Sequence, residues 1–150
     1  MLAGANGGEN PNIDWISSRG FYFFYLLFLA VFHLLLLSVV STPMAWTLTN
    51  ISHNLVSFYF LHMIKGQPWI TAISSETKRE THFEQLDFGQ YWTNQKKFLT
   101  ILPIVMFLLT CVYTKNSEAH FLANFLSLIL VTLPKLPSFH HVRLFNINKY

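Results

Sequence analysis

The sequence predicts an all-α integral membrane protein with four transmembrane helices and with both termini in the cytosol. Only 11% of its 150 residues are charged and 52% are hydrophobic, whereas soluble domains carry roughly 25% charged residues. Residues 20–64 contain no Asp, Glu, Lys or Arg, and about 20 apolar helical residues suffice to cross a bilayer. The alternative, a soluble fold, would need core helices that are hydrophobic all round.

The charge-free stretch divides into two predicted spans. Residues 21–40 are almost entirely Leu, Phe and Val and form the first. The polar, glycine-rich residues 1–20 lack a signal-peptide cleavage pattern, so we expect an uncleaved anchor behind a flexible arm. Thr42 suits a helix N-cap and Pro43 a first helical position. The second span therefore covers residues 43–64 and makes a hairpin with the first.

Two shorter apolar runs, residues 98–114 and 119–134, predict the third and fourth spans. Both are near the lower length limit for crossing, and re-entrant segments are the alternative. Residues 65–97 form an interfacial loop whose aromatic side chains suit the lipid headgroup layer. With residues 135–150 as a tail, we expect one four-helix domain over residues 1–150.

The basic residues predict the orientation of these spans. If all four cross, nine of the ten Lys and Arg residues lie on one side, and Lys115 alone lies on the other. Positive residues are retained on the cytosolic side of a membrane. The N-terminal arm, the loop of residues 65–97 and the tail are therefore expected in the cytosol.

Polar residues inside the second span recur at helical spacing and fall on one face: Thr47, Asn50, His53, Asn54 and Ser57. Such a stripe favours hydrogen bonds between helices over a ligand or ion path. Phe60 falls nearly in line with His53, so we expect it to turn inward with the stripe.

The seven histidines lack the spacing of a metal-binding helix face and are interpreted as packed or interfacial imidazoles. The spans contain no carboxylate, and the chain shows no nucleophile or phosphate-loop motif. We therefore predict that the protein is not an enzyme and has no catalytic residue and no metal ligand.

Short motifs along nearly the whole chain resemble the Orm/ORMDL family. They are NPN and SRG (residues 10–12 and 18–20), WTLTN..HN (46–54), FLH..KG.P (60–68), TH.EQ.D.G (81–89), KFLTI.PI (97–104), YTK (113–115) and PKLP..H.VR.F.INKY (134–150). Each motif is weak alone. All of them in order, at near-family spacing, carry the resemblance.

The resemblance implies a multi-pass protein of the endoplasmic reticulum membrane. Its partners would be the large subunits of serine palmitoyltransferase, in a heteromeric complex, together with ceramide and membrane lipids but no nucleic acid. It would inhibit that enzyme when ceramide is plentiful and so restrain sphingolipid synthesis. The pyridoxal phosphate belongs to the enzyme, and this chain would hold no cofactor.

The resemblance also implies site residues. Asn12 would bind ceramide with help from Phe60 and His82. An inhibitory arm of Met1, Leu2, Ala3 and Gly4 would reach toward the acyl-substrate entrance of the enzyme. From the residues alone, Asn12 also fits simple turn or helix-cap chemistry. Two other functions stay open: a membrane lipid-modifying enzyme that uses the histidines, and a purely structural membrane scaffold.

Overall fold

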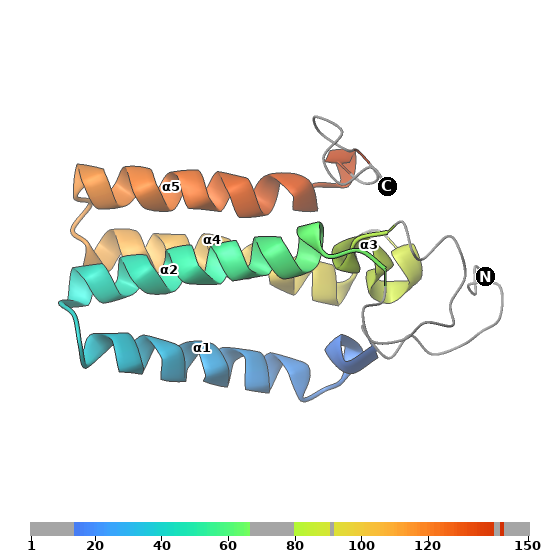
Figure 1. Cartoon of the computed structure of the whole chain (residues 1–150), viewed down its shortest axis with the longest axis horizontal. Coiled ribbons are helices and arrows are strands. Elements are labelled where there is room, and N and C mark those ends of the chain that lie inside the picture. The colour runs from blue at the N-terminus through green and yellow to red at the C-terminus, as the bar shows by residue number, and fades with distance from the viewer. Residues whose placement is uncertain (1–13, 67–79, 91, 140–141, 143–150) are drawn as a thin grey trace.

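Every regular element in the described part of the chain is helical, as predicted. The computed structural model describes residues 14–66, 80–90, 92–139 and 142. Within these ranges four long helices run side by side in alternating directions (Figure 1): α1 (Phe21–Leu37), α2 (Thr42–Phe58), α4 (Asn94–Tyr113) and α5 (Glu118–Thr132). The shorter elements are η1 (Asp14–Ser17), the π-helix η2 (Tyr59–Met63), α3 (His82–Gln85), η4 (Leu86–Gly89), η5 (Leu133–Lys135) and η6 (Pro137–Phe139).

Helix α2 is the centre of the arrangement. It packs against α1, α4 and α5, and α4 also packs against α5. In Figure 1, α2 lies between α1 and α5. The helix predicted to carry a polar stripe is therefore the one surrounded by the others.

The predicted hairpin of the first two helices is present, with slightly different ends. α1 stops at Leu37 rather than Val40, and the hydroxyl of Ser38 donates to the Leu35 carbonyl at 2.6 Å. The N-cap of α2 is Ser41, one residue before the expected Thr42. Ser41 is extended, and Pro43 follows in the first turn, where its fixed φ suits a helix and its missing amide is not needed.

Helix α4 begins before the predicted third span. The Thr93 side chain accepts a hydrogen bond from the Lys96 amide, so this N-cap starts the helix at Asn94 rather than Phe98. At about 1.5 Å per residue its 20 residues extend about 30 Å. Among the described helices, α4 is long and apolar enough to cross a membrane, and α1 is a shorter apolar helix of 17 residues.

The polar stripe of α2 makes hydrogen bonds to α5, as the packing interpretation predicts. Asn50 Nδ2 donates to Asn124 Oδ1 at 2.8 Å, and Asn124 Nδ2 donates to Thr47 Oγ1 at 3.2 Å. Asn54 Nδ2 donates to Ser127 Oγ at 3.0 Å. All five side chains are buried. We call these five residues the asparagine network.

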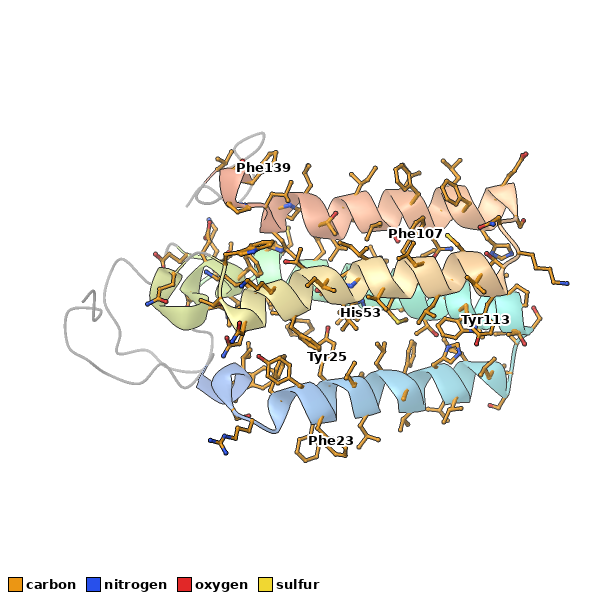
Figure 2. The ribbon with its side chains drawn as sticks, turned by 180° about the vertical axis from the view of Figure 1, so that it is seen from behind. Phe23, Tyr25, His53, Phe107, Tyr113 and Phe139 are labelled. Carbon is orange, nitrogen blue, oxygen red and sulfur yellow. The ribbon has the colours of Figure 1, made fainter. Side chains whose placement is uncertain are left out.

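Three histidines extend this pattern to the neighbouring helices. Their ring nitrogens form hydrogen bonds of 2.8 to 2.9 Å with hydroxyl groups on another helix, in the pairs Tyr25–His53, His33–Thr49 and His120–Thr47. Figure 2 shows Tyr25 pointing from α1 toward α2, where His53 lies. The two contacts from α1 and the asparagine network together fix which faces of the helices meet.

The asparagine network should stabilise the bundle measurably. Asn124→Leu removes three hydrogen bonds of Asn124 and leaves the buried amide of Asn50 without its acceptor. We expect the free energy of unfolding to fall by about 1 to 2 kcal/mol. Detergent-based unfolding titration of the purified protein measures it. Leu122→Ala, at a 58% exposed position of the same helix, is the control, and an equal loss in both variants would contradict the prediction.

Candidate functional site

At one end of the bundle, side chains from six elements form a small apolar core. Elements η1, α1, η2, α3, η4 and α4 each contribute one side chain that is at most 8% exposed. We call this set the end cluster: Ile16, Phe21, Leu61, Phe83, Leu86 and Leu99. Tyr22, Tyr25 and Phe98 pack against it.

The sequence folds α3 onto this end through a capping box. The Thr81 hydroxyl accepts from the Glu84 amide at 3.4 Å, and Glu84 Oε2 accepts from the Thr81 amide at 2.8 Å. Both partners are buried. Because the two bonds satisfy amides that a helix start leaves open, they define where this four-residue helix begins.

Gln85 joins the chain that leaves η2 to the chain that enters α3. Its Nε2 donates to the Gly66 carbonyl at 3.1 Å and to the Glu80 carbonyl at 3.0 Å. The Gly66 amide also donates to the Glu80 carbonyl at 3.0 Å. Gly66 has a φ of 63°, a conformation that glycine adopts without strain. These three hydrogen bonds place the start of α3 beside η2.

His82 is the predicted site residue with the most informative surroundings. Its side chain is half-buried, and its Nε2 is fully buried without a hydrogen-bond partner among the described residues. Burial lowers the pKa of His82, and an interaction with the Gly66 backbone offsets part of that shift. The ring is therefore neutral at pH 7. An unpaired buried nitrogen is costly, so it favours an additional ligand.

The orientation of Phe60 differs from the one predicted from the sequence. It was expected to turn inward with the polar stripe, but its side chain is 52% exposed. The reason is that α2 changes to the π-helix η2 at Tyr59, where the Ile64 amide bonds to the Tyr59 carbonyl five residues back. A wider turn shifts the faces away from the α-helical projection. Leu61, next in sequence, enters the end cluster instead.

The structure therefore places Phe60 and His82 on neighbouring elements, because α3 packs against η2. Asn12 and the arm residues Met1, Leu2, Ala3 and Gly4 lie outside the described residues. The described chain begins at this same end: Ile16 belongs to the end cluster, and Trp15 packs edge-on against Phe21 at 5.4 Å.

Sequence reasoning missed Lys96 and Glu84 as parts of this end. Lys96 is 4% exposed; its ammonium donates to the Gln90 carbonyl and lies 5.6 Å from the centre of the Phe83 ring. The Thr81-x-x-Glu84 spacing is a recognisable capping-box signal. No comparable signal in the sequence identifies the burial of Lys96.

Buried neutral hydrogen bonds between helices, beside one helix that is long and apolar enough to cross a bilayer, are typical of a helical membrane protein. A family model described as the ORMDL family matches residues 10–143. The chain belongs to the ORMDL family.

Curated relatives match this chain over nearly its full length. The chain is 58% identical to the ORM1-like protein of Drosophila melanogaster over 99% of this chain and 98% of that protein. It is 47% identical to ORM1-like protein 2 and 46% identical to ORM1-like protein 3 of Homo sapiens, each over 97% of both chains. The resemblance seen in the short motifs is thus confirmed.

The lowered pKa of His82 predicts an acid-sensitive contribution to stability. Its native pKa lies below the ordinary 6.5, so the unfolded state binds the proton first. Stability should fall as the pH drops from about 6.5 toward the native pKa. His82→Phe should remove this part of the pH dependence, and unfolding titrations of both proteins between pH 7.5 and 5 test it. Identical pH profiles would contradict the prediction.

Proposed function

We propose that this protein is a non-catalytic regulatory subunit of serine palmitoyltransferase in the endoplasmic reticulum membrane. It forms a heteromeric complex with the large subunits of the enzyme and inhibits them when ceramide is plentiful. Membership of the ORMDL family supports this proposal. The end cluster, with His82 beside it, is the proposed place where ceramide acts.

We further propose that all four long helices cross the membrane, with the end cluster on the cytosolic side. Alternating directions support this topology, as does the side preference of nine of the ten basic residues. α1 and α5 have 17 and 15 residues, or about 26 and 23 Å. The endoplasmic reticulum bilayer is thin, about 27 Å, and adapts to shorter helices by local thinning.

The single observation that carries the ceramide proposal is the buried Nε2 of His82, which has no hydrogen-bond partner within the part of the chain that the structure describes. Ceramide presents an amide and hydroxyl groups beside two hydrocarbon chains, at headgroup depth. A neutral imidazole nitrogen pairs with such a group, and exposed apolar surface such as Phe60 contacts a chain. The asparagine amide of Asn12 supplies both a donor and an acceptor for the same headgroup.

The same proposal gives the N-terminal arm its inhibitory role. Asn12 precedes Ile16 of the end cluster by only four residues in the sequence. Ceramide held by Asn12 orders residues Met1 to Gly4 so that they obstruct the acyl-substrate entrance of the enzyme. Ordering of a segment by a ligand is a common form of regulation.

The histidines do not favour the rival enzyme function. His33, His53 and His120 each make a hydrogen bond to a hydroxyl group of another helix. These bonds give the three residues a role in packing. The scaffold alternative differs from the proposal in one measurable respect, because a scaffold binds the enzyme without changing its response to ceramide.

Asn12→Ala should preserve assembly with serine palmitoyltransferase but weaken the ceramide response. Loss of a partly buried hydrogen bond costs about 1 to 2 kcal/mol, which raises the half-inhibitory ceramide concentration about tenfold. Long-chain-base synthesis by the purified complex, measured across a ceramide titration, tests this. Asn10→Ala, in the same NPN motif, is the matched control.

Two results would contradict parts of this account. An unchanged ceramide response in Asn12→Ala removes Asn12 from the mechanism. If the wild-type complex shows no ceramide response at all, the regulatory function itself is wrong.

A further inference from the structure

Lys135 is a buried lysine that joins three elements at the end of the bundle. It belongs to η5, directly after α5, and its side chain is 2% exposed. Its ammonium donates to the Leu99 carbonyl of α4 at 2.8 Å and to the Ser57 hydroxyl of α2 at 3.3 Å. Both acceptors are uncharged.

The Leu99 carbonyl is available because of Pro103. In an α-helix the amide of residue 103 bonds to the carbonyl of residue 99, and proline has no amide hydrogen. Pro103 lies inside α4 and is fully buried, so water does not replace the missing donor. Lys135 therefore supplies from another element the hydrogen bond that Pro103 denies to Leu99.

Burial of the Lys135 ammonium costs desolvation free energy, which the hydrogen bond to Leu99 offsets. Burial lowers the pKa of Lys135 to about 7. An apolar side chain in its place would avoid that desolvation, but it would leave the Leu99 carbonyl unsatisfied. The desolvation of the ammonium and its hydrogen bond to Leu99 have opposite effects on stability. The net contribution of Lys135 therefore depends on whether residue 103 is a proline.

The two acceptors are directly connected to the candidate site. Leu99 contributes its side chain to the end cluster, and Leu61 of the cluster follows Ser57 by about one helical turn. Lys135 thus holds the turns of α2 and α4 that support Phe83 and α3. It also fixes the point where the C-terminal tail leaves the bundle.

We propose that Lys135 is a positioning residue for the ceramide site, acting through the hydrogen bond that replaces the missing amide of Pro103. This inference rests on the proposed function for its ligand. Its structural part, the coupling between Lys135 and Pro103, is independent of any ligand.

A double-mutant cycle tests the coupling. Lys135→Met, Pro103→Ala and the double variant are unfolded in detergent, with Lys115→Met, an exposed lysine at the other end, as the control. Pro103→Ala restores an amide for Leu99. Lys135→Met should therefore shift the unfolding equilibrium constant at least fivefold more in the wild-type background than in the Pro103→Ala background. Equal shifts in both backgrounds would overturn the inference.

The ceramide response tests the positioning role. In complex with serine palmitoyltransferase, Lys135→Met should raise the half-inhibitory ceramide concentration at least threefold while maximal inhibition is retained. Adding Pro103→Ala should bring the concentration part of the way back toward the wild-type value, because the new amide satisfies Leu99 but not Ser57. If the wild type responds and Lys135→Met responds identically, this inference alone fails. If the wild type does not respond, the proposed function fails, and the unfolding cycle still decides the coupling.

Discussion

The rest of the structure depends on the hydrogen bonds between α2 and α5. Amide side chains on the buried face of an apolar helix need partners within the protein, because lipid offers none. Asn50 and Asn124 satisfy each other across the interface, and Thr47, Asn54 and Ser127 complete the set. Histidines then connect the same helices outward, with His53 reaching α1 through Tyr25. Directional bonds of this kind specify one rotation of each helix, which apolar packing alone does poorly.

That fixed pairing determines what meets at the end of the bundle. With α2 held at the centre, its π-helical extension places Leu61 against Phe83 and Leu99. Gln85 and the capping box of Thr81 and Glu84 then hold α3 on this surface. The His82 side chain is consequently half-buried beside an apolar core, and its buried Nε2 has no hydrogen-bond partner among the described residues. A polar and an apolar feature thus lie side by side, which is the combination that a lipid with a hydrogen-bonding headgroup requires.

Much of the fold could be predicted from the sequence because its strongest signals are simple. Long apolar runs predicted the helices, and the three- and four-residue spacing of Thr47, Asn50 and Asn54 predicted the buried face of α2. The orientation of Phe60 was wrong because a helical projection assumes one turn geometry and cannot foresee the π-helix at Tyr59. Lys135 was read only as a basic tail residue. Its burial depends on a carbonyl freed by Pro103 in a different helix, and such a pairing is visible only in three dimensions.

The central claim is that ceramide acts at the end cluster beside His82. The most direct measurement uses a ceramide with a photoreactive group next to its amide, crosslinked to the purified complex with serine palmitoyltransferase and mapped by mass spectrometry. The account predicts adducts on residues 57–66 and 80–90, removed by excess unlabelled ceramide. Adducts confined to the opposite end of the bundle, near Trp46 and Tyr113, which stack at 4.5 Å, would contradict it.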